Sequence, residues 1–214
     1  VISLNFLFQI FILICFQFFY YKIAKKFNFL DKPNHRSSHD KSTIIGGGIL
    51  FPFAVILWIF YYSFSYNYFL FILLLISIIS FIDDIFKINQ LIRFSGHIIG
   101  SYLLLYELDL FLNNIIILFI IIVLIIGWLN AYNFMDGIDG IIGVQTVAIG
   151  IGVLLIASSV TVGLVGLTLA AAACGFLVLN WYPAKIFLGD VGSIPVGFLV
   201  GWLLLLNLEE QFYC

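Results

Sequence analysis

Long apolar stretches fill most of this chain and constrain its fold more than any other feature. A helix needs about 20 mostly apolar residues to cross the hydrocarbon core of a bilayer. The sequence offers candidate spans at about 2–21, 44–64, 66–82, 94–107, 111–129, 141–157, 160–179 and 194–208. Because lipid cannot satisfy the backbone groups of an open strand, we predict helices. The expected fold is all-α, a polytopic transmembrane helical bundle of about eight spans that forms one membrane domain over residues 1–214.

The composition supports a membrane environment. Of the 214 residues, 64% are hydrophobic and 9% are charged, whereas soluble domains are about half apolar and about a quarter charged. The formal net charge is -2, and a nucleic-acid-binding protein needs a basic face. We therefore expect a membrane as the surroundings of this chain and no nucleic acid as a partner.

The positions of the basic residues indicate the orientation. If all the spans cross, the segments after the first, third, fifth and seventh spans share one side, and they contain every Lys and Arg of the chain. The opposite side carries only acids, Glu107, Asp109, Glu209 and Glu210. Because Lys and Arg are enriched in cytoplasmic loops, we predict that these four segments are cytoplasmic and that the N-terminus lies outside.

The same four segments contain the polar motifs of the chain. They are DKPNHRSSHDKSTIIGGG at 31–48, the Asp83-Asp84 pair in FIDDIFKI, NAYNFMDGIDG at 130–140 and NWYPAKIFLGDVGS at 180–193. Carboxylates at a membrane boundary are costly, so several that converge on one face indicate a bound cation or a reactive site. The alternative is structural, with Asp residues that cap helices and Gly residues that form turns.

Two pairs of carboxylates favour the functional interpretation. Asp83 and Asp84 follow a long uncharged run, and adjacent anions repel each other unless a cation or water lies near them. Helix capping would explain one of these two residues but not both. Asp136 and Asp139 are three residues apart, so on a helical turn their carboxylates would point the same way.

Polar residues next to these pairs extend the predicted site. Asn130 and Asn133 continue the face of Asp136 by another turn and offer hydrogen-bond donors and acceptors. Asp190, in GDVGS, comes just before the last span. At such a position helix amides can bind a phosphate and a carboxylate can bind its metal ion.

These motifs, taken in order, resemble those of the polyprenyl-phosphate N-acetylhexosamine-1-phosphate transferases. This superfamily includes the phospho-muramoyl-pentapeptide translocase and the undecaprenyl-phosphate GlcNAc-1-phosphate transferases. The resemblance covers essentially the whole chain. Its most specific elements are DGIDG and LGDVGS. The segments NFMDGIDGI and NWYPAKIFLGDVGS are most similar in sequence to the branch that initiates O-antigen synthesis.

The resemblance implies roles for individual residues. Asp83 and Asp84 match the family's essential acidic pair, and Asp190 matches the aspartate that ligates magnesium, for which manganese is an alternative. The implied substrate-binding residues are His39, Asn130, Asn133, Asp136, Asp139 and Lys185.

The resemblance also implies a reaction and a location. The reaction is Mg²⁺-dependent transfer of N-acetylhexosamine-1-phosphate from a UDP-N-acetylhexosamine to undecaprenyl (polyprenyl) phosphate, with release of UMP. It initiates synthesis of a cell-envelope polysaccharide such as the O-antigen of lipopolysaccharide. The expected location is the bacterial inner membrane, with the active site on the cytoplasmic face, and the family includes homodimers.

Two other interpretations stay open from the sequence. The first is a secondary transporter with a carboxylate ion site, although transporters place such groups near the bilayer midplane and these acids lie at the ends of spans. The second is an inactive, truncated remnant of the transferase, because the family has further spans and a last cytoplasmic loop that these 214 residues lack.

Overall fold

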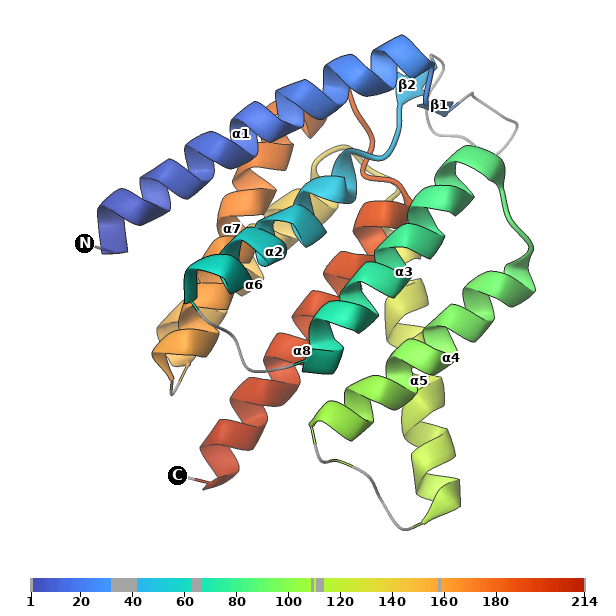
Figure 1. Ribbon diagram of the computed structural model, residues 1–214, viewed down its shortest axis with the longest axis vertical. Coiled ribbons are helices and arrows are strands. Elements are labelled where there is room, and N and C mark those ends of the chain that lie inside the picture. The colour runs from blue at the N-terminus through green and yellow to red at the C-terminus, as the bar shows by residue number, and fades with distance from the viewer. Residues whose placement is uncertain are drawn as a thin grey trace.

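The computed structural model describes residues 2–31, 42–62, 67–108, 110, 114–157 and 159–213, and over these ranges the chain is a helical bundle (Figure 1). The eight α-helices are α1 (Ile2–Phe27), α2 (Leu50–Tyr62), α3 (Asn67–Phe86), α4 (Gln90–Glu107), α5 (Ile115–Met135), α6 (Ile141–Ile156), α7 (Val160–Asn180) and α8 (Asp190–Tyr213). Between α1 and α2 lie the short strands β1 (Leu30–Asp31) and β2 (Thr43–Ile44) and the 3-10 helix η1 (Gly47–Ile49). The predicted all-α fold is confirmed.

Several of these helices have the length and composition of membrane spans. Among the described residues, four segments are long and apolar enough to cross a bilayer: Leu7–Phe27, Tyr68–Phe86, Ile115–Met135 and Val160–Asn180. Shorter apolar helices cover Gly47–Phe60, Ile141–Ile156 and Asp190–Leu206. The prediction of a polytopic membrane fold is thus confirmed, whereas the number of spans and the side of the N-terminus stay predictions.

The helices extend beyond the apolar stretches that mark them in the sequence. α3 continues through Asp83 and Asp84, α5 includes Asn130 and Asn133, and α8 begins at Asp190. The predicted boundaries followed hydropathy, which falls where polar residues begin. The backbone hydrogen bonding of the helices continues into these polar residues. These five polar residues are therefore fixed on helix ends and do not lie in loops.

A short backbone ladder joins the first polar segment to the fourth. Leu30 pairs with Ile44 in the antiparallel β1–β2 ladder. The Phe187 N–H donates to the Ile44 carbonyl at 2.7 Å, and the N–H groups of Gly47 and Gly48 donate to the carbonyls of Phe187 and Leu188, both at 2.9 Å. The sequence did not predict these strands, which position residues 42–48 beside the start of α8.

Helix α8 packs against both α3 and α5. The Phe69 ring of α3 lies 4.1 Å from the buried Trp202 ring, centroid to centroid. The Trp128 Nε1–H of α5 donates to the Gly197 carbonyl at 2.8 Å. A Cβ on Gly201 would lie 3.1 Å from Trp128 Nε1, so this small residue allows the close approach. These contacts fix the register of three helices whose ends carry polar motifs.

The tightest backbone crossing gives a test of this arrangement. A Cβ on Gly48 would overlap the Gly192 Cα and lie 2.6 Å from the Gly192 nitrogen. Because backbone cannot rotate away, we expect Gly48→Ala to destabilise the protein by about 1–3 kcal/mol, a typical cost of overpacking. Thermal unfolding of the detergent-purified protein measures this as a lower Tm.

Gly127→Ala is the matched control, because nothing lies within 4 Å of a Cβ at this position on α5. Its Tm should stay the same or rise slightly, since alanine favours a helix over glycine. Equal Tm values for the two alanine variants would contradict the crossing of residues 47–48 over the start of α8.

Candidate active site

The polar motifs meet at one end of the bundle. We call this end the polar end and define it as residues 42–48, 83–93, 130–140 and 180–193. Figure 1 shows the C-terminal end of α3 beside the N-terminal end of α8. Side chains and backbone from all four segments are joined there by hydrogen bonds or ion pairs, although Asp84 and Val191 are 107 residues apart in the sequence. The polar end therefore contains the candidate active site.

Asp84 binds the N-terminus of α8. Its Oδ1 accepts a hydrogen bond from the Asp190 N–H at 2.9 Å and its Oδ2 accepts one from the Val191 N–H at 3.0 Å. The first amides of a helix lack intrahelical partners and carry partial positive charge, so an anion there is stabilising. Asp84 thus caps α8 from another helix and fixes the position of Asp190.

This capping corrects one expectation from the sequence. The amides at the start of α8 were expected to be able to bind a phosphate. Two of them bind Asp84 instead, and the N–H groups of Gly192 and Ser193 donate to the Gly189 carbonyl at 3.0 and 2.9 Å. Because these four donors already have partners within the protein, a phosphate at the polar end would need other groups.

Asp83 faces a basic residue and Asp190. Arg93 Nη1 lies 2.7 Å from Asp83 Oδ2 and 2.8 Å from Asp190 Oδ2. The three side chains are largely buried, with 25% of Arg93, 12% of Asp83 and 20% of Asp190 exposed. A single guanidinium nitrogen thus bridges Asp83, from the predicted acidic pair, and Asp190, the predicted metal ligand.

Sequence reasoning counted Arg93 among the basic residues but did not place it in the site. Asn89 caps α4, since its Oδ1 accepts from the Leu91 N–H at 2.9 Å, and this places Arg93 in the first turn of that helix. Asp83 and Arg93 are equally far in sequence from Ile88, in the short α3–α4 connection. In a helical hairpin such residues lie opposite each other. Their spacing could therefore have predicted that Arg93 lies beside Asp83.

Asp83, Asp84, Arg93 and Asp190 form a cluster, and Asn133 at the end of α5 and Asp136 just after it also belong to it. Asn133 Oδ1 accepts a hydrogen bond from Ser193 Oγ at 3.0 Å. Burial raises the pKa of Asp136 well above its ordinary value, the negative charges of Asp84 and Asp190 raise it further, and a hydrogen bond from the Gly189 N–H opposes the rise. A cation beside these carboxylates would stabilise the charged form of Asp136.

Asp136 and Asp139 do not lie on a helical turn, contrary to the prediction. Helix α5 ends at Met135, and residues 136–140 form turns. Asp139 Oδ2 instead accepts from the Ala184 N–H at 2.9 Å. Asn180 completes this connection, because its Oδ1 accepts from the Gly140 N–H and its Nδ2 donates to the Ile186 carbonyl, both at 2.8 Å.

The other predicted substrate-binding residues lie apart from these contacts. The Asn130 Nδ2 donates to the Ile126 carbonyl of its own helix at 2.8 Å. The Lys185 side chain is exposed, and its backbone N–H donates to the Leu179 carbonyl at 2.8 Å. His39 lies outside the described residues.

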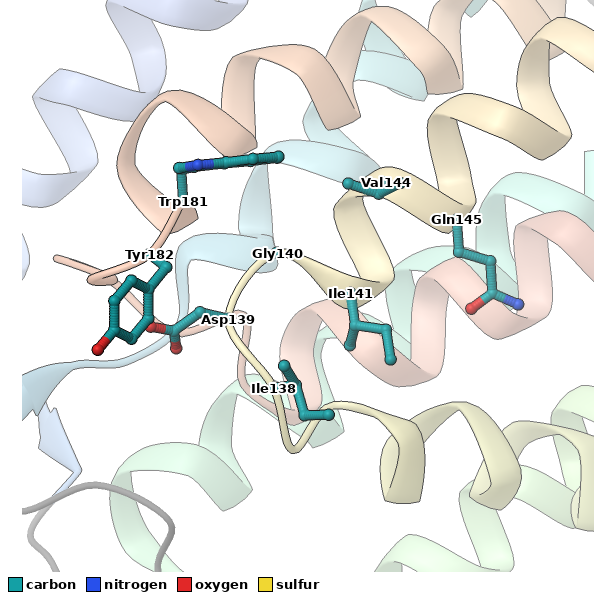
Figure 2. A pocket seen from close by; sticks show the side chains of 8 residues that line it. All are labelled: Ile138, Asp139, Gly140, Ile141, Val144, Gln145, Trp181 and Tyr182. Carbon is teal, nitrogen blue, oxygen red and sulfur yellow. The ribbon is translucent and has the colours of Figure 1, made fainter.

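A pocket of about 580 Å³ lies beside Asp139 (Figure 2). Trp181 and Tyr182 contribute large aromatic rings that are 63% and 80% exposed. Its lining residues are Ile138, Asp139, Gly140, Ile141, Val144, Gln145, Trp181 and Tyr182. The pocket offers flat apolar surfaces next to a carboxylate, which suits a planar ligand with polar edges.

The donor groups at the polar end fit a hard divalent cation. Among the residues that the structure describes, no three His, Cys, Asp or Glu side chains form a ready-made metal cage. Magnesium, however, needs only one or two protein carboxylates, because it keeps several waters and takes further oxygens from substrate phosphates. Asp83 and Asp190, whose oxygens share one cationic nitrogen, could supply such a pair for Mg²⁺ or Mn²⁺.

Comparison with known proteins shows the family to which the chain belongs. The model of glycosyl transferase family 4 matches residues 66–207, from the start of α3 to within α8. The chain belongs to this family. The matched region contains all four cluster carboxylates and Arg93, so the candidate active site lies within the family 4 region.

Curated family 4 relatives include three bacterial enzymes. A probable undecaprenyl-phosphate N-acetylglucosaminyl 1-phosphate transferase of Bacillus subtilis is 26% identical over 213 residues, covering 89% of this chain and 58% of the relative. The undecaprenyl-phosphate alpha-N-acetylglucosaminyl 1-phosphate transferase of Escherichia coli K12 is 30% identical, with the same coverage. A phospho-N-acetylmuramoyl-pentapeptide-transferase of Prochlorococcus marinus is 27% identical, covering 87% and 63%. The chain thus spans about three fifths of the length of these relatives.

The two acids of the Asp83-Asp84 pair should differ in their effect on stability. Asp84→Ala leaves two α8 amides without their acceptor, so we expect a loss of about 1–2 kcal/mol, as for removal of an N-cap. Asp83→Ala should cost less, because Arg93 keeps its contact with Asp190. Thermal unfolding in detergent without divalent ions tests this order, and an equal or larger loss for Asp83→Ala would show that Asp84 does not anchor α8.

Proposed function

We propose that this chain transfers an N-acetylhexosamine-1-phosphate from a UDP-sugar to undecaprenyl (polyprenyl) phosphate and releases UMP. The observation that carries the proposal is the bridge from Asp83 through Arg93 to Asp190, next to Asp84 and Asp136 at the ends of apolar helices. Such a site can meet a water-soluble diphosphate and a lipid headgroup together. The names of the family 4 relatives, which specify undecaprenyl-phosphate and 1-phosphate transfer, support this proposal.

The proposed reaction is a phosphoryl transfer. An oxygen of the lipid phosphate forms a bond to the β-phosphorus of the UDP-sugar, and the bond from that phosphorus to the oxygen that bridges it to the α-phosphorus breaks. UMP leaves with the bridging oxygen. Such reactions depend mainly on positioning and on neutralisation of charge. The second pKa of a phosphate monoester is about 6, so the acceptor is mostly dianionic at neutral pH without a base.

The acids of the cluster then have distinct roles. Asp190 and Asp83 would hold Mg²⁺, which supplies Lewis acidity and neutralises the diphosphate charge. Asp83 serves to orient the metal and the lipid phosphate more than to remove a proton. Asp84 positions Asp190 through the α8 amides, and Asn133 and Asp136 border the site from α5.

The pocket beside Asp139 suits the nucleoside of the donor. Trp181 and Tyr182 offer ring faces for a base, and the Asp139 carboxylate and the Gln145 amide offer polar contacts. Asp136, at the cluster, and Asp139, at the pocket, are separated by at most about 11 Å of extended chain. A nucleotide can span this distance, with its diphosphate at the cluster and its base in the pocket.

An apolar pocket of about 470 Å³ between α4, α5 and α8 suits the isoprenoid tail of the acceptor. Its lining residues are Leu104, Leu105, Leu110, Ile121, Leu124, Ile125, Trp128, Leu129, Gly197, Phe198, Gly201, Leu204 and Leu205. The rise of a helix places Trp128 about 12 Å along α5 from Asp136. The tail would therefore lie beneath a headgroup bound at the cluster, since α5 and α8 border both sites.

The location and the pathway follow from the same proposal. The distribution of Lys and Arg supports a polar end on the cytoplasmic side of the bacterial inner membrane, the side on which a nucleotide sugar would be available. The lipid-linked product would initiate a cell-envelope polysaccharide, and the sequence resemblance to the O-antigen branch favours lipopolysaccharide.

A UMP-exchange assay tests the proposed reaction. Membranes that contain the chain, undecaprenyl phosphate and Mg²⁺ should exchange labelled UMP into UDP-N-acetylhexosamine. Asp190→Asn should reduce exchange by about 100-fold or more, because loss of metal-based charge neutralisation costs several kcal/mol. The variant should still insert into the membrane.

Glu107→Gln is the matched control, because it also replaces a carboxylate with an amide. Glu107 lies at the C-terminal end of α4, whereas Arg93 lies at its N-terminal end. Glu107 accepts a hydrogen bond from the Tyr68 N–H at 2.9 Å, which a glutamine can also accept. Its exchange rate should stay near that of the parent. Near-normal exchange by Asp190→Asn would refute the metal role, and accumulation of label inside sealed vesicles would favour the transporter instead.

A further inference from the structure

The guanidinium of Arg93 lies between the two carboxylates that the proposed function assigns to a divalent cation. Each carboxylate contributes one oxygen, Asp83 Oδ2 at 2.7 Å and Asp190 Oδ2 at 2.8 Å, to the same Nη1. Arginine cannot lose its proton in a protein, so this positive charge is permanent. It opposes the repulsion between two largely buried anions.

We propose that Arg93 is a built-in counter-cation that competes with the divalent metal ion for Asp83 and Asp190. Metal binding then releases the guanidinium toward the phosphates of the substrate. This inference rests on the proposed function, because it concerns the same metal site. It assigns Arg93 a role that was not among the predictions from the sequence.

The divalent metal ion and the Arg93 guanidinium cannot bind the two carboxylates at the same time. Magnesium binds carboxylate oxygens at about 2.0–2.1 Å, which is shorter than either distance from these oxygens to Nη1. Oxygens that close around a metal ion leave no room for the nitrogen between them, and two adjacent positive charges repel. The metal ion can therefore bind both oxygens only if the guanidinium leaves.

The position of Arg93 on α4 permits this movement. It lies in the first turn of the helix, and 25% of its side chain is exposed. The long side chain can rotate toward solvent without a shift of the helix axis. A released guanidinium stays at the polar end, where its planar fork matches two phosphate oxygens.

The competition between Arg93 and the metal ion predicts that metal binding and anion binding are coupled. A phosphate ligand stabilises the released guanidinium, and the released state is the one that binds the metal. Each ligand should therefore raise the affinity for the other. This would keep the metal site weak until an anionic substrate arrives.

Mn²⁺ titration of the purified chain, followed by electron paramagnetic resonance, tests the competition without reference to turnover. Arg93→Gln should bind Mn²⁺ about tenfold more tightly than the parent when no anion is present. Inorganic pyrophosphate should raise the affinity of the parent for Mn²⁺ more than that of the variant. Lys87→Gln is the control, because it removes one charge from an exposed residue of the same α3–α4 connection and should leave the affinity within about twofold of the parent.

A second measurement does not depend on a variant that could misfold. Mn²⁺ should increase the modification of Arg93 by phenylglyoxal in the parent, as read by peptide mass spectrometry, because release exposes the guanidinium. Unchanged or reduced modification would overturn the proposal.

The outcomes separate this inference from the proposed function. If Asp190→Asn abolishes Mn²⁺ binding but Arg93→Gln binds with parental or lower affinity, the counter-cation role is wrong and the metal site stands. If Asp190→Asn binds Mn²⁺ as well as the parent does, the assignment of Asp190 as metal ligand fails, and this inference fails with it.

Discussion

The contact between the Asp84 carboxylate and the first amides of α8 organises the polar end. It joins the last turn of α3 to the first turn of α8 through two charge-assisted hydrogen bonds, of 2.9 and 3.0 Å. Since Asp83 precedes Asp84 and Asp190 begins α8, the same contact sets the distance between those two carboxylates. Arg93 can bridge them because Asp84 holds the two helix ends together.

Packing between helices within the bundle stabilises this contact. Phe69 and Trp202 fix α3 against α8, and Trp128 fixes α5 against the same helix through the Gly197 carbonyl. Helix α8 therefore carries Asp190 in a defined position relative to both Asp83 and Asp136. The apolar surfaces belong in lipid, whereas the acids collect where the helices end, and this division suits an enzyme that acts on a lipid headgroup.

Much of the fold could be predicted from hydropathy and charge alone. Long apolar runs predicted the helices, and the distribution of Lys and Arg grouped the four polar segments whose described parts meet in the structure. The different tasks of Asp83 and Asp84 could not be predicted, because capping of α8 by Asp84 is a contact across 106 residues. The hydrogen bond from the Ala184 N–H to Asp139 could not be predicted either, because it depends on the residue at which α5 ends, which hydropathy does not determine.

The account depends on the four polar segments lying on the same side of the membrane. Single cysteines at Lys87, Ile138 and Lys185, all exposed, in a chain whose Cys15, Cys174 and Cys214 are replaced by serine, can be tested with a membrane-impermeant thiol reagent. We predict that all three react in inside-out vesicles and are protected in intact spheroplasts. Reaction of any one of them from the opposite side would contradict the assembly of these segments into one site.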